Sequence, residues 1–337
     1  MPDFAASSPS PGTALTSLWN WVAERSGSPG SGPRLELVCA EHPDPERGNR
    51  AAEVIRLPGC ASEAPLHGLF ELLTAGAHSV VIRLDGCANQ AAALAHFEAL
   101  TALLEAASFG RFKVFTQAPT AQAKRTVLLA NQLPVSRRKL LTLGLGTRSQ
   151  ATPPDLSSSD PERLNFALRE LLGPTSADLS QVPARALAFT AAGCTACNVC
   201  VRACPSDALV LRHGPANDGL GASEVTISSL SQIPANCDAC TLCVQSCPQD
   251  VLKIAGTWDW GTVLDQPTAH SPIVSRPTAK CTRCGARFPA TTTGPGASPT
   301  GSAANQSPLC QVCSYRRKNP FSSMSPPDLR LGPTAAR

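Results

Sequence analysis

The sequence predicts a multidomain chain of the α/β plus α+β class, and three observations carry that prediction. Short apolar runs alternate with helical patterns in the first third, as in a parallel sheet with crossover helices. A run of four cysteines that ends in Cys-Pro occurs twice between residues 194 and 248, and two further C-x2-C pairs follow it. At 337 residues the chain is long enough for several such units.

The composition predicts long connectors between these units. The chain has 31 prolines and 24 glycines beside an apolar share of 42%, which supports packed cores. We therefore expect seven segments, given by residue number: a flexible tail (1–33), an α/β domain (34–145), a linker with an amphipathic helix (146–187), a domain with the repeated cysteine run (188–256), a linker (257–275), a four-cysteine module (276–320) and a flexible tail (321–337).

The first of these domains is expected to be a small, parallel, Rossmann-like sheet with right-handed crossovers. Its expected strands are Leu35–Ala40, Val54–Leu57, Val80–Leu84 and Phe112–Phe115. Its expected helices are Leu66–Thr74 and Ala91–Ala107, where apolar residues recur at helical spacing. The segment Ala123–Leu145 also has a helical pattern, interrupted by Pro134.

The flanking segments carry weaker patterns. A short helix near Leu15–Glu24, with Trp19 and Trp21, is expected to belong to a loose tail. Residues 146–159 are loop-like, and Asp160 is expected to cap an amphipathic helix with Pro161 at its first position. Residues 291–307 consist almost wholly of small and polar residues and predict a flexible excursion. The buried stripe of the amphipathic helix is expected to be Leu164, Leu168, Leu171 and Leu172.

Twelve of the fifteen cysteines lie in C-x2-C pairs or their extensions, which indicates metal ligation. We find no signal peptide, so disulfides are not expected. The first run is Cys194-x2-Cys197-x2-Cys200-x3-Cys204-Pro205, and the second is Cys237-x2-Cys240-x2-Cys243-x3-Cys247-Pro248. The repeat extends past the cysteines, since Asp207, Leu209 and Leu211 match Asp250, Leu252 and Ile254. A cuboidal iron-sulfur cluster needs four thiolate ligands, and one tight C-x2-C-x2-C loop supplies only three. The fourth ligand must therefore come from elsewhere in the chain.

The double run resembles the bacterial two-cluster ferredoxins over about residues 188–256. The resemblance implies two [4Fe-4S] clusters in which the fourth cysteine of each run crosses to the other cluster. The apolar neighbours Val199, Val201, Leu242 and Val244 are expected to exclude water from the clusters. The implied ligand sets are Cys194, Cys197, Cys200 and Cys247 for cluster 1, and Cys237, Cys240, Cys243 and Cys204 for cluster 2.

A second kind of metal site is expected near the C-terminal end. Because Zn²⁺ favours four thiolates in a closed tetrahedron and each C-x2-C turn presents two, we expect a zinc-ribbon-like knuckle. Iron in a rubredoxin-like site is the main alternative. The basic run Arg316-Arg317-Lys318 is expected to be a solvated surface rather than a contact to an acidic partner or RNA. The four expected ligands are Cys281, Cys284, Cys310 and Cys313.

The N-terminal domain carries a further resemblance, in four segments: Leu37-Val38-Cys39, Val54-Ile55-Arg56-Leu57-Pro58-Gly59-Cys60, Ala75-Gly76-Ala77-His78-Ser79-Val80-Val81-Ile82 and Asp85-Gly86-Cys87. Over about residues 35–118 it resembles the delta subunit of methyl-viologen-reducing hydrogenase. That family implies an α/β iron-sulfur module that passes electrons within hydrogenase and heterodisulfide-reductase complexes. The sequence departs from the family in the loop after Cys87, which is cysteine-rich in the family but reads Ala88-Asn89-Gln90 here.

Cys39, Cys60 and Cys87 each fall at or just past the expected carboxyl end of a strand, the edge where α/β sheets build their sites. Together with His42 or a water, the three thiolates are a candidate site for a cluster or zinc. The alternative, which the residues alone favour, is that they are ordinary small core residues.

The remaining patterns indicate where in the cell the protein is located and which kinds of partner it has. The net charge of +4 is too small to indicate a nucleic-acid surface, and no stretch approaches the roughly 18 apolar residues of a membrane span. Ser136-Arg137-Arg138-Lys139-Leu140-Leu141 resembles a twin-arginine export motif, but it follows a whole expected domain, which favours a basic interdomain helix. We therefore expect a cytoplasmic protein without direct membrane insertion and without nucleic acid.

Together these features predict an electron-transfer iron-sulfur protein. It would be a ferredoxin-like subunit that relays single electrons to or from a partner oxidoreductase such as a hydrogenase, dehydrogenase or reductase complex. The sequence shows no nucleotide-binding loop after a strand and no nucleophile elbow, which favours a non-catalytic component. Two alternatives stay open: a redox-sensing or regulatory iron-sulfur and zinc protein, and a catalytic subunit of an iron-sulfur reductase.

Overall fold

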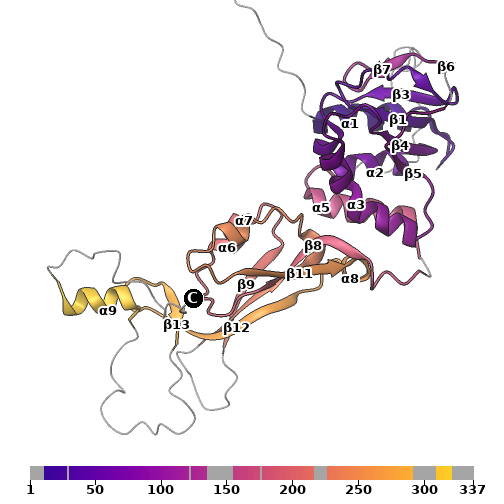
Figure 1. The fold of residues 1–337 in the computed structure, drawn as a ribbon. Coiled ribbons are helices and arrows are strands. Elements are labelled where there is room, and N and C mark those ends of the chain that lie inside the picture. Colours follow the sequence, from indigo (N-terminus) through magenta and orange to yellow (C-terminus); the bar gives the residue numbers. More distant parts are fainter. Residues whose placement is uncertain are drawn as a thin grey trace, which may run out of the picture.

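The structure is a computed structural model that describes residues 11–28, 30–120, 123–134, 155–174, 177–215, 226–290 and 309–320. Figure 1 shows its two largest parts, an N-terminal part (residues 11–134) and a cysteine-run part (residues 183–289). The N-terminal part is built on a five-stranded sheet, and the cysteine-run part on two smaller antiparallel sheets.

The five-stranded sheet is parallel throughout, as the sequence predicted for its first four strands. Its order is β5-β4-β1-β3-β7. The strands are β1 (Arg34–Val38), β3 (Ala52–Arg56), β4 (Ser79–Arg83), β5 (Phe112–Phe115) and β7 (Val127–Leu129). Two crossover helices, α2 (Leu66–Thr74) and α3 (Gln90–Ala106), confirm the two predicted helices with ends that differ by at most one residue. The sheet places the chain segments after β1, β3 and β4 at one edge.

The fifth strand corrects the helix expected over Ala123–Leu145. Residues Ala123–Lys124 form β6, which pairs with β2 (Arg47–Gly48), and β7 pairs in parallel with β3. A short apolar run such as Val127–Leu129 fits a strand or a helix equally well by periodicity alone, so the sheet edge decides its conformation. Residues 135–145, with the twin-arginine-like Ser136–Leu141, lie outside the described residues.

The N-terminal helix also differs from the expectation of a loose tail. Helix α1 (Pro11–Ala23) packs against α2, and Leu18 and Val22 are completely buried. The two helices approach closely at Gly68, where a Cβ would lie 2.8 Å from Leu15 Cδ1. Trp19 and Trp21 are buried as well, so this helix is part of the core in the residues that the structure describes.

Helix α5 (Asp160–Leu172) connects the two parts. Its N-cap is Ser159 rather than the expected Asp160, and Ser159 N donates to Glu162 Oε2 at 2.9 Å. Leu164 and Leu168 are buried as expected, whereas Leu171 and Leu172 are only partly buried. On one side of α5, the guanidinium of Arg163 donates to both carboxylate oxygens of Glu71 on α2, at 2.8 and 2.7 Å. Such a bidentate pair fixes the helix against α2.

The other side of α5 contacts the cysteine-run part. Asn165 Nδ2 donates to Ala235 O at 2.6 Å, and Asn236 Nδ2 donates to Glu162 Oε1 at 3.2 Å. A further contact comes from helix α8 (Trp260–Asp265), where Trp260 Nε1 donates to Ala99 O of α3 at 2.9 Å. The core of the N-terminal part therefore continues through α5 into β8 (Pro183–Thr190) and α8, while a second, smaller buried cluster lies around Leu209 and Leu230.

Acidification should weaken this junction through His67 of α2. Burial and the nearby Arg163 lower the pKa of His67, although Asp160 and Glu71 act in the opposite direction. The unfolded chain, with a histidine pKa of about 6.5, therefore binds the proton more readily. Stability is fully present above about pH 6.5 and falls as the pH drops toward the folded-state pKa.

Urea unfolding between about pH 7.5 and 5.5 measures this effect. His67→Gln should flatten the dependence of the unfolding free energy on pH, by at most about 1.4 kcal/mol per pH unit for one histidine. Equal slopes in the wild type and the variant would contradict this account of His67.

In the cysteine-run part, each strand next to one run pairs with a strand next to the other run. Strand β8 (Pro183–Thr190) precedes the first run and pairs with β11 (Lys253–Asp259), which follows the second. Strand β9 (Leu209–Pro215) follows the first run and pairs with β10 (Thr226–Gln232), which precedes the second. Strands β12 (Ser271–Lys280) and β13 (Arg287–Pro289) extend the second pair in the order β13-β12-β10-β9. The two halves are thus interlocked by their backbones.

Candidate metal centres

The two cysteine runs adopt the same unusual backbone. Ala196 and Asn198 in the first run have φ values of 57° and 67°, and Ala239 and Thr241, at the matching positions of the second run, have 67° and 61°. Left-handed backbone at a non-glycine residue costs about 1 kcal/mol or more, so its repetition marks a constraint on the loop. Ala196 N–H donates to Cys194 Sγ at 3.4 Å, and Ala239 N–H likewise hydrogen-bonds Cys237. The loops therefore turn backbone donors toward sulfur.

Short helices carry the third cysteine of each run. Helix α6 (Val199–Ala203) begins after Asn198 and contains Cys200, and helix α7 (Leu242–Gln245) begins after Thr241 and contains Cys243. The two helices contact each other. The sequence alone did not reveal the left-handed positions, although the repeat aligns them.

Each run contributes to two separate cavities. The first cavity is lined by Cys194, Cys197, Cys200 and Cys247, together with Leu211, Leu230 and Leu252. The second is lined by Cys204, Cys237, Cys240 and Cys243, together with Phe189 and Leu209. Three cysteines of each cavity come from one run and the fourth comes from the other run. These are the two groups of four cysteines that the ferredoxin resemblance implies as ligand sets, and their role as ligands stays a prediction.

Thiol proximity follows the same crossed grouping. Burial, and then the nearby Cys194 and Cys197, raise the pKa of Cys200 to about 11, and Cys247 adds to the effect. Burial and the nearby Cys204 and Cys237 raise the pKa of Cys243 to about 12. These sulfurs are thus crowded together in a weakly solvated environment, which suits a bound cationic centre that keeps thiolates deprotonated.

The apolar neighbours divide into two kinds. Val201 and Val244 pack against the buried cluster around Leu209 and Leu230, as expected of water-excluding residues. Val199 and Leu242 differ from that expectation, because they are 37% and 44% exposed. They lie at matching positions of the repeat, at the start of α6 and of α7, so each cysteine run carries an apolar residue on the surface.

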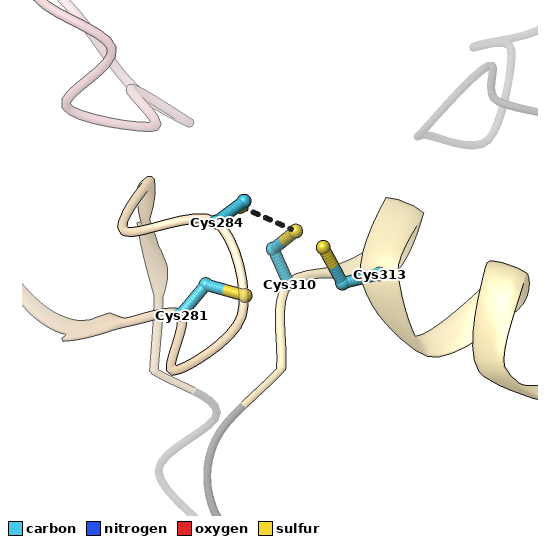
Figure 2. A group of neighbouring side chains, drawn as sticks. All are labelled: Cys281, Cys284, Cys310 and Cys313. Atoms are coloured by element: carbon cyan, nitrogen blue, oxygen red, sulfur yellow. Dashed lines mark hydrogen bonds between the residues drawn. The ribbon is translucent and has the colours of Figure 1, made fainter.

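The four C-terminal cysteines converge in the same way. Figure 2 shows their side chains pointing toward one another, Cys281 and Cys284 from the loop after β12, and Cys310 and Cys313 from the start of helix α9 (Gln311–Lys318). Their sulfurs all lie within 4.8 Å of one another, and Cys284 Sγ is 3.7 Å from Cys310 Sγ. Gly285, with φ of 74°, closes the first turn by donating its N–H to Cys281 O at 2.8 Å.

The three N-terminal cysteines also come together. Cys39 follows β1, Cys60 follows β3 and Cys87 follows β4, and their sulfurs lie within 4.8 Å of one another. Cys39 is buried, whereas Cys60 and Cys87 are half-buried with their sulfurs 3.7 Å apart. His42, the expected fourth ligand, is not part of this group: its Nε2 lies 3.3 Å from Asp85 Oδ1, and its Nδ1 accepts from Asp44 N at 3.2 Å.

One cavity lies between the two parts of the molecule. It has a volume of about 280 Å³ and is lined by Ser62, Glu63 and Ala64 on the N-terminal side and by Cys237 and Asp238 on the other. The segment that carries Cys60 therefore continues into the wall that faces Cys237. This proximity has no local signature in the sequence, because it depends on how α5 packs.

Comparison with known proteins supports the cysteine-run part. The family model described as a 4Fe-4S dicluster domain matches residues 193–251, which contain all eight cysteines of the two runs. The chain therefore contains a ferredoxin-type iron-sulfur domain. No curated protein matches the chain. Among the described residues, no helix is both long enough and apolar enough to cross a membrane.

Proposed function

We propose that this chain is an electron-transfer protein that carries single electrons through two [4Fe-4S] clusters. Cys194, Cys197, Cys200 and Cys247 hold one cluster, and Cys204, Cys237, Cys240 and Cys243 hold the other. The observation that carries the proposal is the pair of separate cavities, each lined by four cysteines from both runs. The match to a 4Fe-4S dicluster domain supports it independently.

The surface near the cysteine runs suits exchange with a protein partner. Cys197 and Cys240 are exposed, and Val199 and Leu242 lie exposed two residues after them. An electron donor or acceptor that docks on such an apolar spot comes close to a cluster ligand. We therefore propose that the partner is a redox protein or a larger oxidoreductase complex. In this proposal the chain acts in the cytoplasm and relays single electrons to or from that partner.

We further propose a structural zinc ion at Cys281, Cys284, Cys310 and Cys313. Four thiolates from two C-x2-C turns form a closed tetrahedral donor set, for which Zn²⁺ has a strong preference. The spacing of 3.7 Å between Cys284 Sγ and Cys310 Sγ agrees with the edge of a tetrahedron whose bonds are about 2.3 Å long, which is about 3.8 Å. The ion would hold α9 against the loop after β12.

Metal analysis of the anaerobically purified chain tests both proposals. We expect about eight irons and about eight acid-labile sulfides per chain, because two cubanes contain that number. Cys284→Ser should remove about one zinc and leave the iron unchanged, and Ser314→Ala, beside Cys313, should remove neither. A reproducible value of about four irons would refute two clusters. One iron lost with Cys284→Ser, in place of zinc, would show a rubredoxin-like site.

Electron counting tests the function itself. The fully reduced chain should deliver about two electrons to an excess of a one-electron acceptor, since each cluster stores one. Its reduced EPR spectrum should show coupling between two neighbouring paramagnetic clusters. If the chain held its full iron content but could not be reduced reversibly, the proposed metal sites would stand and electron transfer as their function would be refuted.

A further inference from the structure

The three N-terminal cysteines have the geometry of a metal site. They come from three different strand ends, yet all three sulfurs lie within 4.8 Å of one another. The distance of 3.7 Å between Cys60 Sγ and Cys87 Sγ equals that between Cys284 Sγ and Cys310 Sγ in the C-terminal group. It also agrees with the edge of about 3.8 Å expected for thiolates around one zinc ion.

The loops that carry these cysteines are tied to one another. Ala40 N donates to Gly59 O at 3.0 Å, which joins the loop after Cys39 to the loop before Cys60. Ala61 N donates to Cys39 Sγ at 3.3 Å. A backbone N–H that donates to a ligand sulfur orients that sulfur before any metal binds.

Two arginines donate hydrogen bonds to the loops that carry Cys39 and Cys87. The guanidinium of Arg56 donates to the carbonyl oxygens of Ala40 and His42, just after Cys39. The guanidinium of Arg83 donates to both carboxylate oxygens of Asp85, two residues before Cys87, at 3.1 and 2.8 Å. Both arginines thus hold the conformation of the loops that carry Cys39 and Cys87.

The loop before Cys87 also packs closely against the loop after Cys39. A Cβ at Gly86 would lie 2.4 Å from Pro43 Cδ and 3.3 Å from His42 Cδ2. A proline ring cannot move away as the end of a flexible side chain can, so this contact fixes the separation of the two loops. The three thiols are therefore held in place by backbone and by packing.

The donor set fits one ion rather than a cluster. Iron-sulfur clusters are generally held by four protein ligands, and no fourth cysteine or histidine joins the group in the described part of the chain. The fourth candidate, His42, is engaged with Asp85 and Asp44. Three thiolates that leave one position open are a donor set for a zinc ion with an exchangeable ligand.

We propose that Cys39, Cys60 and Cys87 bind one zinc ion whose fourth position is open to a small exogenous ligand. Because Cys60 and Cys87 are half-buried and Cys39 is buried, the open position lies on the side of Cys60 and Cys87. A water or a free thiolate fits there, whereas the C-terminal site is closed by its fourth cysteine. This inference does not depend on the proposed electron transfer, because neither the ion nor its ligands belong to the clusters.

Zinc content of the full-length chain tests the inference first. We expect about two zinc ions per chain, of which Cys60→Ser removes about one and Cys284→Ser removes the other. Iron should remain at the wild-type value in both variants, which shows that the rest of the chain is folded. If Cys284→Ser removed all of the zinc that the wild-type chain binds, the inference would be overturned. Iron lost with Cys60→Ser would also overturn it, because it would show a cluster at the three cysteines.

Gly86→Ala is a second variant that keeps every thiol. The added methyl group collides with Pro43 and should displace Cys87, lowering the zinc affinity of this site by about 10- to 100-fold. The matched control is Gly110→Ala, in the same part of the chain, because a Cβ there has no atom within 4 Å. Competition with a zinc chelator measures both, in the Cys284→Ser background. Equal affinities in the two glycine variants would overturn the preorganised site.

Cobalt substitution tests the open position. In the Cys284→Ser background, Co²⁺ bound at the N-terminal site should give tetrahedral absorption bands that shift when a small thiol is added. In the Cys60→Ser background, Co²⁺ at the closed C-terminal site should give bands that the thiol leaves unchanged. An N-terminal spectrum that does not respond to the thiol would overturn the open coordination.

Discussion

Cys204→Ala is expected to destroy the cluster of Cys237, Cys240 and Cys243 and to spare the cluster nearest to it in sequence. The reason is the second cavity, where Cys204 lies with the three cysteines of the other run. A cubane that loses one of four thiolates sheds iron or takes a weaker ligand, so the iron content should fall from about eight toward about four. EPR of the reduced variant should show one unperturbed cluster without the coupling seen in the wild type.

Double variants identify which cluster survives. Adding Cys237→Ala to Cys204→Ala should cost no further intact cluster, whereas adding Cys194→Ala should remove the remaining one. The opposite result would show that each run closes its own cluster. Ser206→Ala is the matched control, since Ser206 Oγ lies 3.7 Å from Cys204 Sγ without being a ligand in the proposed set, and both clusters should persist.

Trp260→Ala should cause the largest loss of stability, about 3–5 kcal/mol of unfolding free energy. Trp260 is 2% exposed, and its indole lies where α8 meets α3 and the wall of the cavity near Cys237. Truncation removes a large apolar side chain from the shared core and leaves Ala99 O without the donor it has from Nε1. Anaerobic urea unfolding followed by circular dichroism measures the change.

Phe166→Ala is the matched control for this experiment. Phe166 is also aromatic and lies on α5, but it is 56% exposed. Its truncation should change the unfolding free energy by less than about 0.5 kcal/mol, as is usual at the surface. A Trp260→Ala variant as stable as Phe166→Ala would show that the junction contributes little to the folded state.

Local patterns predicted the parts of the fold that depend on local physics. The alternation of apolar runs with helical patterns located the first four parallel strands and both crossover helices. The spacing of the cysteine runs indicated which residues would meet, because a C-x2-C-x2-C loop brings its sulfurs together regardless of the surroundings. The strand-end rule likewise pointed to Cys39, Cys60 and Cys87, although the favoured interpretation was that they are core residues.

Features that depend on tertiary packing were not predictable in this way. Helix α1 looks like a tail because its neighbours are rich in Ser, Pro and Gly, and it is the burial of Leu18 and Val22 that shows that it belongs to the core. Val127–Leu129 became a strand because the edge of β3 was free to pair with it. The contact between Trp260 and Ala99 joins residues far apart in the chain and has no local signature.

The pairing of β8 with β11 sets the order of events during synthesis. Strand β8 leaves the ribosome first, but its partner follows only after both cysteine runs have been made. At about 5–20 residues per second, the edge of β8 stays unpaired for several seconds. Unpaired strand edges attract other chains, and the thiols of the first run are exposed during the same interval. The edge of β8 that β11 covers in the finished fold is therefore open to other chains until the second cysteine run has been made.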